Sequence, residues 1–329
     1  MRATSLPFAH RVYRTGMTTR FRGLDYRDGV LIEGPAGWSE VSPFWDYDIP
    51  ESSAWLAAGL ESAYLGYPEP VRASIPVNVT VPATTPEKAQ AIIARRGGCE
   101  TAKIKVAEKG QSLDDDLDRI AAVRDVFDGK IRIDANAGWD RHTAIHSIPL
   151  LDRAAGGLEY VEQPVSTVED LSAVRKAVAV PIAADESIRR AEDPYRVAKH
   201  DAADLIVCKV QPLGGVRACL RLAQDIGLPV VVSSALESSV GIRAGVALAA
   251  SLPELDYACG LATVQLFEHD VTSDRLVPTA GELPVRDIDP DTIEPVDEEL
   301  EARWATRLRD MWEHLVATRN VSDITGGAL

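Results

Sequence analysis

Residues 130–136 read KIRIDAN, a short strand pattern that ends on a carboxylate, Asp134. The same arrangement, an apolar run that ends on a charged residue, recurs in TAKIKV (101–106), LEYVEQ (158–163), VPIAAD (180–185) and ADLIVCKV (203–210). Charged groups at the ends of hydrophobic strands cost stability unless they meet around a common centre. The strands of a parallel barrel meet at their C-terminal ends, where the active sites of such barrels lie. The pattern therefore predicts a barrel with a charged active site.

Three further apolar runs extend the pattern to eight candidate strands: IPVNVTV (75–81), LPVVVSS (228–234) and YACGLAT (257–263). Helical patterns alternate with them at residues 86–98, 112–127, 168–179, 214–227 and 240–252. Eight strands in little more than two hundred residues favour a closed α/β barrel of the TIM type. An open doubly wound sheet is the alternative, but no GxGxxG motif follows the first strand.

The flanks of the barrel pattern predict two further parts. Residues 1–74 indicate an α+β capping domain, with an antiparallel meander followed by a helix at 52–66 that begins at Ser52 or Ser53. Residues 75–280 form the predicted catalytic barrel. Residues 281–329 are expected to pack on the cap or the barrel, mainly through a helix at 298–319, and residues 322–329 are expected to be loose.

The composition restricts the partners. A net charge of −15 argues against nucleic acid and anionic membranes. A small anionic carboxylate substrate stays compatible, because a local group of cations can oppose the overall sign. The four cysteines show no disulfide spacing, and there is no signal-peptide pattern or long apolar run, so we expect a cytoplasmic protein.

Three carboxylates, Asp134, Glu162 and Asp185, end consecutive predicted strands. Their spacings of 28 and 23 residues are each close to one strand–helix repeat, so all three are expected at one rim of the barrel. Carboxylate oxygens on separate rigid strands are typical ligands of Mg²⁺. Each aspartate alone could equally cap a helix; the three in register favour a metal site.

Lysines flank the carboxylates in the sequence. Lys103 and Lys105 are two residues apart in a strand, so their side chains share one face. Their mutual repulsion should lower the pKa of at least one of them, which suits a general base. Lys209 ends a later strand and is expected on the opposite side of the barrel mouth. Solvated lysines on an edge strand are the alternative explanation for the KxK pattern alone.

Polar residues beside these groups complete the predicted site. We expect one set to orient the carboxylates or the lysines: Asn136, Gln163, Glu186 and Gln211. A second set, at the end of the seventh strand, suits an anionic arm of the substrate: Ser233, Ser234 and Glu237. Helix capping explains this second set equally well. The six histidines have no paired ligand spacing and are interpreted as surface or packing residues.

The motif series resembles the enolase superfamily, in its muconate-lactonizing branch. Within that branch, TAKIKVAE, RIDANAGW, YVEQP, IAADESIR, KVQPLGG and SSALESSVG are similar to the actinobacterial o-succinylbenzoate synthase family. The resemblance covers about residues 10–280. It implies a capping domain built from both chain ends over a (β/α)₇β barrel, with Mg²⁺, or alternatively Mn²⁺, on the three carboxylates.

The resemblance also implies the chemistry. Lys105 would remove the proton α to a carboxylate of 2-succinyl-6-hydroxy-2,4-cyclohexadiene-1-carboxylate, the metal would stabilise the enediolate, and water would be lost to give o-succinylbenzoate, a step of menaquinone biosynthesis. Lys209 would stabilise the intermediate from the other face. The combination of a lysine base with Mg²⁺ at an enediolate is a known catalytic pattern of this superfamily.

Two departures leave alternatives open. The capping loop at residues 20–23, where Arg22 is the expected contact to substrate, is short, so a more open mouth is expected. The eighth strand lacks the DxD motif of dipeptide epimerases, but N-acylamino acid racemase activity stays an alternative. Two other functions also stay open: a metal-free lyase that uses a lysine Schiff base, and a non-catalytic binding barrel. The sequence does not decide whether the protein is a monomer or a homo-oligomer.

Overall fold

The computed structural model describes residues 6–21, 23–190 and 193–329 of the chain. Its centre is a parallel sheet in which each strand pairs with the next one along the chain. Among the described residues this sheet has seven strands: β5 Val79–Val81, β6 Thr101–Lys105, β7 Lys130–Asp134, β8 Leu158–Glu162, β9 Ile182–Ala184, β10 Leu205–Cys208 and β11 Val230–Val232. The unbroken order confirms the barrel, because a doubly wound sheet reverses its strand order at a switch point.

Two residues close the ring between its first and last strands. Cys259 bridges to Val77 and Gly260 bridges to Ser233, both in parallel orientation. The Cys259 N–H donates to the carbonyl of Pro76 at 2.7 Å. The predicted eighth strand is thus shorter than expected, because the chain turns into the 3₁₀ helix η1 at Ala262–Leu266.

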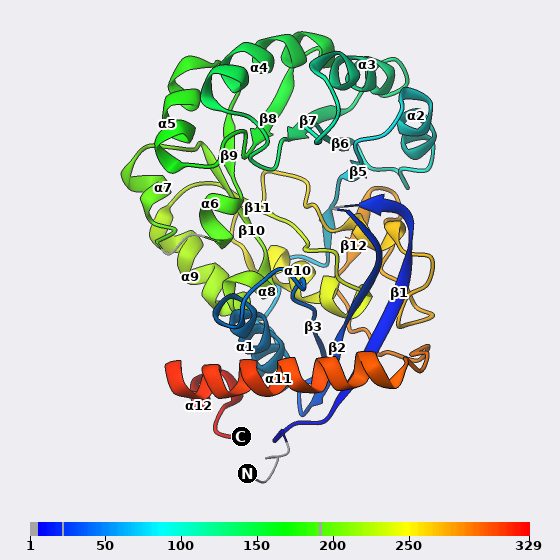
Figure 1. Ribbon diagram of the computed structural model, residues 1–329, viewed down its shortest axis with the longest axis vertical. Helices are drawn as coiled ribbons and strands as arrows, with labels where there is room; N and C mark the ends of the chain where they lie inside the picture. Colours follow the sequence, from blue (N-terminus) through cyan, green and yellow to red (C-terminus); the bar gives the residue numbers. More distant parts are fainter. Residues whose placement is uncertain (1–5, 22, 191–192) are drawn as a thin grey trace.

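Helices cover the outside of the ring (Figure 1). They are α2 Pro86–Ala94, α3 Leu113–Arg124, α4 Arg141–Ala155, α5 Val168–Ala177, α7 Arg196–Lys199, α9 Val216–Ile226 and α10 Ser239–Ser251. Two short helices, α6 Glu186–Arg189 and α8 Val210–Leu213, lie instead at the rim that faces the cap. A continuous apolar core fills the layer between strands and helices. A smaller core inside the ring contains Tyr160, Leu205, Val207 and Val231. Buried side chains on both faces explain why the strands read as nearly continuous apolar runs.

The cap combines both ends of the chain. Its antiparallel sheet consists of β1 His10–Phe21, β2 Leu24–Gly34 and β3 Gly37–Val41. Helix α1 Ile49–Leu65 packs on this sheet, and the C-terminal helices α11 Glu298–Thr318 and α12 Ser322–Thr325 pack on α1. Figure 1 shows α11 lying across α1 beneath the cap strands. The predicted meander and the predicted packing of the last long helix are confirmed.

Two local expectations were wrong. Helix α1 begins at Ile49 rather than near Ser52, because the Asp48 side chain accepts the Glu51 N–H at 2.8 Å and Pro50 suits the first turn. Residues 322–325 form a helical turn in contact with α1 and are therefore not loose.

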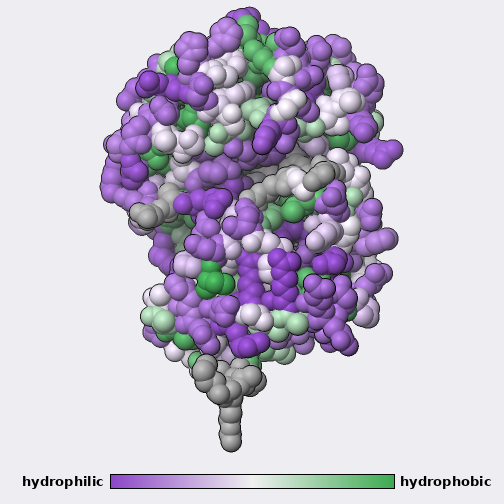
Figure 2. All heavy atoms as spheres, viewed as in Figure 1, coloured by the Kyte–Doolittle hydropathy of each residue, from purple (hydrophilic) through white to green (hydrophobic). Residues whose placement is uncertain are grey.

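Beneath the ring, β4 Ser74–Pro76 pairs with β12 Glu282–Pro284 in a two-stranded sheet. Both predicted domain boundaries, at 74/75 and 280/281, fall beside this pair and stay predictions. The face shown in Figure 2 is mostly hydrophilic, with hydrophobic atoms in small separate groups. In the described part of the chain, no helix combines the length and the apolar character that crossing a membrane requires.

Candidate active site

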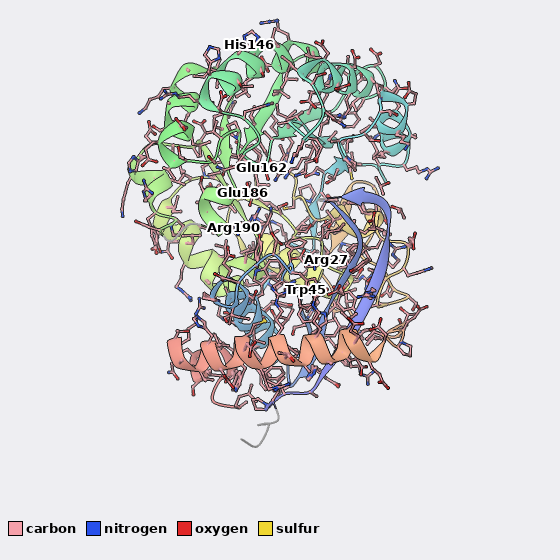
Figure 3. The ribbon with its side chains drawn as sticks, in the orientation of Figure 1. Arg27, Trp45, His146, Glu162, Glu186 and Arg190 are labelled. Atoms are coloured by element: carbon pink, nitrogen blue, oxygen red, sulfur yellow. The ribbon has the colours of Figure 1, made fainter. Side chains whose placement is uncertain are left out.

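The strand ends bring the charged residues together in register. Lys105 on β6 pairs with Asp134 on β7, and Asp134 pairs with Glu162 on β8. Asp185 directly follows β9, and Lys209 directly follows β10. In Figure 3 Glu162 lies at the end of the barrel that faces the cap. The structure thus places these groups at one rim, and their catalytic and metal-binding roles stay predictions.

A cavity of about 770 Å³ lies at this rim, between barrel and cap. The cap contributes Gly23 and Phe44 to its wall. The barrel contributes charged and polar side chains: Lys103, Lys105, Asp134, Asn136, Glu186, Arg189, Arg190, Lys209, Ser233, Ser234 and Thr263. Pro82, Ala83, Ala235 and Leu236 add apolar surface. A cavity with several converging charges at the C-terminal end of barrel strands is the expected position of an active site.

Lys103 is the buried counter-ion of two carboxylates. Its Nζ lies 2.9 Å from Asp134 Oδ2 and 2.7 Å from Glu162 Oε1. Burial alone would lower the pKa of Lys103, but the charges of Asp134 and Glu162 outweigh burial and raise it well above the ordinary value. The lowering of the pKa that was expected for at least one of the two lysines therefore does not occur at Lys103. A lysine held protonated in this way is poorly suited to act as a base.

The carboxylates differ in their pKa values. Burial would raise the pKa of Asp134, but Lys103 and Lys105 hold it well below the ordinary range. Burial, followed by the negative charge of Asp134, raises the pKa of Glu162 to about 7. Burial would also raise the pKa of Asp185, but Arg189 and Lys209 lower it to about 2. The rim therefore concentrates negative charge that nearby cations stabilise.

Lys105 and Lys209 approach the cavity from opposite sides. Lys105 Nζ donates to Asp134 Oδ2 at 2.6 Å and to Asn136 Oδ1 at 2.5 Å. Lys209 Nζ donates to Asp185 Oδ2 at 2.6 Å. Three strands separate β6 from β10 in the sheet, and these are the strands that lead to the three carboxylates. Two amines thus face each other across the carboxylates.

The donor set fits a divalent cation such as Mg²⁺. Three carboxylates converge on one rim, and Glu162 Oε2 is buried without a hydrogen-bond partner among the described residues. However, within those same residues no three acidic, histidine or cysteine side chains are placed so that they could hold a metal as they stand. Asp134 and Glu162 share the Lys103 ammonium instead, so a side chain of the protein supplies positive charge to these two carboxylates in this arrangement. The assignment of these three carboxylates as metal ligands stays a prediction.

The other predicted residues divide into two groups. Asn136, Glu186, Ser233 and Ser234 line the cavity. Gln163 faces the chain after β9, where its Oε1 accepts the N–H groups of Asp185 and Ser187. Two further residues lie behind the cavity wall, at the junction with the cap: Gln211, which bonds Ser42, and Glu237, which accepts the Ala235 N–H. Arg22 lies outside the described residues. His146 is exposed on α4, far from the cavity in Figure 3, as expected of a surface residue.

Arg189 and Phe44 are among the residues of the cavity wall that sequence reasoning missed. Arg189 donates to Asp185 Oδ1 at 2.9 Å and to Glu186 Oε1 at 2.6 Å. Its position four residues after Asp185, on one helix turn, was the available signal. Phe44 comes from the cap, and nothing in the local sequence connects it with the barrel rim.

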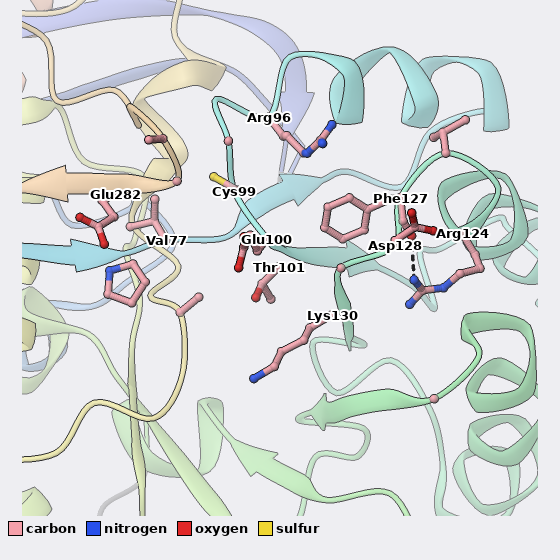
Figure 4. Close-up of a pocket in the computed structure, with 18 of the residues that line it drawn as sticks. Val77, Arg96, Cys99, Glu100, Thr101, Arg124, Phe127, Asp128, Lys130 and Glu282 are labelled. Atoms are coloured by element: carbon pink, nitrogen blue, oxygen red, sulfur yellow. Dashed lines mark hydrogen bonds between the residues drawn. The ribbon is translucent and has the colours of Figure 1, made fainter.

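A second cavity of about 1150 Å³ lies at the opposite ends of the strands (Figure 4). Its wall includes Thr101 and Lys130, at the starts of β6 and β7. Arg124 there donates to the backbone carbonyls of Ala155 and Phe127. The N-terminal face of a barrel serves stability rather than catalysis. We therefore assign the active site to the smaller cavity.

The chain is similar to proteins of known families. The family described as "Enolase C-terminal domain-like" matches residues 85–290, and that described as "Enolase N-terminal domain-like" matches residues 12–63. The chain is 56% identical over 311 residues to the o-succinylbenzoate synthase of Thermobifida fusca (strain YX), with 93% of this chain and 97% of the relative covered. It is 52% identical over 275 residues to that of Mycobacterium leprae (strain TN), with 84% and 81% covered.

Solved structures share the fold. The L-Ala-D/L-Glu epimerase from Bacillus subtilis matches with a TM-score of 0.73 at 23% identity, over 88% of this chain and 98% of its own. The muconate lactonizing enzyme from Pseudomonas fluorescens matches with 0.72 at 21%, over 90% and 97%. The dipeptide epimerase from Enterococcus faecalis V583, complexed with Mg and a dipeptide, matches with 0.71 at 22%, over 88% and 99%. At these identities the structures support the fold and nothing finer.

Proposed function

The chain belongs to the o-succinylbenzoate synthase family of the enolase superfamily, and on this premise we propose that Lys105 is the base that starts its reaction. The protein is a carbon–oxygen lyase of menaquinone biosynthesis, and it dehydrates 2-succinyl-6-hydroxy-2,4-cyclohexadiene-1-carboxylate to o-succinylbenzoate. The observation that supports the role of Lys105 most directly is its amine at the cavity wall, facing Lys209 across the carboxylates.

The reaction breaks two bonds of the substrate. The C–H bond α to the ring carboxylate breaks first, and its electron pair passes into an enediolate. The C–O bond to the ring hydroxyl then breaks, a new ring double bond forms, and water leaves with the abstracted proton. Because the ring becomes aromatic, the second half is favourable, and the first proton transfer is the difficult step.

Lys105 is placed to carry that proton. Its neutral amine would accept the α-proton, and the resulting ammonium would return it to the departing hydroxyl. Asp134 Oδ2 and Asn136 Oδ1 both contact the Lys105 Nζ and so hold it at the cavity wall. Lys103, whose pKa is raised by two carboxylates, is assigned the role of a fixed cation.

Lys209 would stabilise the negative charge that develops on the opposite face of the substrate. Its ammonium is held by Asp185, and its side chain is largely buried, so the charge acts in a medium of low dielectric constant. The hydroxyls of Ser233 and Ser234 line the cavity and would bind the succinyl arm. Thr263 supports this wall through a 2.7 Å contact with the Ser234 hydroxyl.

Asp134, Glu162 and Asp185 would hold a divalent cation, Mg²⁺ or alternatively Mn²⁺. Its bound charge would lower the free energy of the enediolate, because the α-proton of a carboxylate is a very weak acid. The convergence of the three carboxylates on one rim and the buried Glu162 Oε2, which lacks a hydrogen-bond partner among the described residues, support this assignment. A cytoplasmic location is part of the same proposal, supported by four buried cysteines that are all free.

The proposal is tested by replacing Lys105→Ala. We expect the rate of dehydration to fall by about 10²–10⁴-fold, the usual contribution of a positioned base. This rate is measured from the change in ultraviolet absorbance as the substrate is consumed. Mn²⁺ binding should persist, because the carboxylates remain. Lys176→Ala, which changes an exposed lysine on α5, is the matched control. A Lys105→Ala enzyme that works at the wild-type rate would refute the assignment.

Chelation separates this mechanism from the metal-free alternative. EDTA should abolish turnover, and added Mg²⁺ should restore it. A Schiff-base lyase would instead keep its activity in EDTA and would be trapped covalently on the substrate by borohydride.

A further inference from the structure

We propose that Arg189 is a positioning residue that connects the cap to the catalytic carboxylates, through Tyr47 on one side and Asp185 on the other. This inference rests on the proposed function, since it assigns Asp185 to the cation site. Arg189 lies on the four-residue helix α6, directly after the strand that carries Asp185. Its side chain is only 8% exposed, although it borders the cavity.

One guanidinium serves three acceptors. Nε donates to Asp185 Oδ1 at 2.9 Å, one terminal nitrogen donates to Glu186 Oε1 at 2.6 Å, and the other donates to the Tyr47 hydroxyl. The planar fork of arginine makes such simultaneous contacts possible, whereas a lysine provides a single point of charge. The three acceptors come from two parts of the molecule, the barrel rim and the cap.

On the barrel side, these contacts fix the geometry of the site. Arg189 holds Asp185 Oδ1 while Lys209 holds Oδ2, so both oxygens of this carboxylate have set directions. Glu186 Oε1 also accepts the Asn136 amide at 3.2 Å, and Asn136 Oδ1 accepts the Lys105 ammonium. An unbroken series of hydrogen bonds thus joins Arg189 to the proposed base.

On the cap side, Tyr47 belongs to the loop between β3 and α1 that also carries Phe44, part of the cavity wall. Arg307 of the C-terminal helix α11 donates to the carbonyls of Phe44 and Tyr47 at 2.7 and 3.0 Å. The Tyr47 ring packs edge-on against Phe44 and Trp55. The loop is therefore fixed to the cap, and the hydrogen bond to the Tyr47 hydroxyl makes the position of Arg189 depend on the position of the cap.

Two variants that preserve charge test the connection: Arg189→Lys and Tyr47→Phe. Mn²⁺ binding is measured by calorimetry on the purified full chain without substrate. We expect Arg189→Lys to weaken binding by about 10–100-fold, the usual effect of losing a partner of a metal ligand. Tyr47→Phe should weaken it by about fivefold, as for one lost hydrogen bond. Arg196→Lys, on an exposed arginine of α7 paired with Glu169, is the matched control and should bind as wild type.

The double variant distinguishes a connection from two separate effects. Because both residues act through the same link, Arg189→Lys with Tyr47→Phe should bind Mn²⁺ as Arg189→Lys alone does. Hydrogen exchange of the amides at residues 44–48 should be faster in both single variants. Wild-type Mn²⁺ affinity in Arg189→Lys, or losses that multiply in the double variant, would overturn the inference. The Mn²⁺ titration needs no turnover, so it tests Arg189 even if Lys105 is not the base. The dehydration assay of Lys105→Ala likewise tests the base even if Arg189 does not affect Mn²⁺ binding.

Discussion

The pKa of Lys103 is raised, so the lowering expected for at least one of the lysines Lys103 and Lys105 does not occur at Lys103. The two-residue spacing of Lys103 and Lys105 predicts that both point into the ring, and both line the cavity. Repulsion between neighbours in the sequence suggested a lowered pKa. The nearest charges in the fold are instead Asp134 and Glu162, the latter 59 residues away in the chain. Electrostatic character depends on such distant partners, which a strand pattern does not contain.

Replacing Lys103→Met should destabilise the protein in the presence of EDTA. The change leaves Glu162 buried without the ammonium that it contacts at 2.7 Å, and removing one partner of a buried pair typically costs about 3–5 kcal/mol. Urea denaturation measures the free energy of unfolding. Saturating Mg²⁺ should restore part of the loss, because a bound divalent cation supplies positive charge to the same carboxylates.

Lys199→Met is the control for this variant. Lys199 pairs with Asp193 at 3.0 Å on the surface, where such a pair is worth at most about 1 kcal/mol. Equal stability of Lys103→Met and wild type would contradict the view that Lys103 balances the buried carboxylates.

Five charged residues at strand ends could be predicted because each ends a recognisable apolar run, and Lys103 because it lies two residues before Lys105. For Arg189 the sequence offered only its spacing from Asp185, because its other partner, Tyr47, lies 142 residues earlier in the chain. Gln211 and Glu237 do not line the cavity: Gln211 accepts the Ser42 N–H of the cap, and Glu237 accepts the Ala235 N–H. A residue next to a strand-end charge can be predicted to lie at that end of the barrel. The direction of its side chain depends on how the cap packs against the barrel, which the local sequence does not show.

At the scale of elements, helices were predictable where their pattern is regular. The predicted helix at 298–319 agrees with α11 to within one residue, because its apolar positions repeat at helical spacing and Asp297 caps its first turn. Helix α4 was not predicted. It contains Pro149, which lacks the N–H that a helix interior requires, so the local sequence argues against the helix that the barrel layer stabilises.

The junction between β3 and α10 contains two buried carboxylates. Glu40 accepts the Tyr13 hydroxyl at 2.8 Å and the Ser238 N–H at 3.0 Å. Burial, followed by the charge of Glu40, raises the pKa of Glu237 to about 7. Arg27 partly compensates, since its charge lowers the pKa of both carboxyls. This junction holds the cap on the loop after β11.

The raised pKa of Glu237 predicts a pH-dependent stability. In the unfolded chain a glutamate titrates near 4.3, so between about pH 4.3 and 7 the folded protein binds this proton more tightly than the unfolded chain does. The stability that Glu237 contributes is therefore complete below about pH 4.3 and is lost as the pH rises through 7. Glu237→Gln, which keeps the acceptor for the Ala235 N–H, should remove this dependence.

Urea denaturation at pH 5 and pH 8 measures the effect. The free energy of unfolding of Glu237→Gln, relative to that of wild type, should be higher at pH 8 than at pH 5 by on the order of 2–3 kcal/mol. Glu254→Gln, at an exposed position after α10, should gain none and serves as the control. A difference between Glu237→Gln and wild type that does not change with pH would contradict the prediction.

At the scale of the whole molecule, the cap is a product of both chain ends. One apolar cluster contains Val30 and Ile32 of β2, Trp55 of α1, and Trp304 and Met311 of α11. Local patterns predicted these elements separately, and the resemblance to the enolase superfamily supplied their association. Contacts between residues almost 280 positions apart leave no periodic signal in a single sequence, which explains why the pattern alone left the packing partner of the last helix open.

The shared cluster predicts that both chain ends unfold together. Trp304 is fully buried, and its Nε1 donates to Asp28 Oδ1 of β2 at 2.8 Å, so Trp304→Ala removes a large side chain and leaves a buried carboxylate without one donor. We expect the free energy of unfolding to fall by about 3–5 kcal/mol in urea. Hydrogen exchange should accelerate in β1–β3 as well as in α11, because neither buries its apolar face without the other. Glu313→Ala, on the exposed face of the same helix, should change neither measurement. Faster exchange confined to α11 would mean that the N-terminal sheet is stable without the C-terminal helix, and that the cap is two units rather than one.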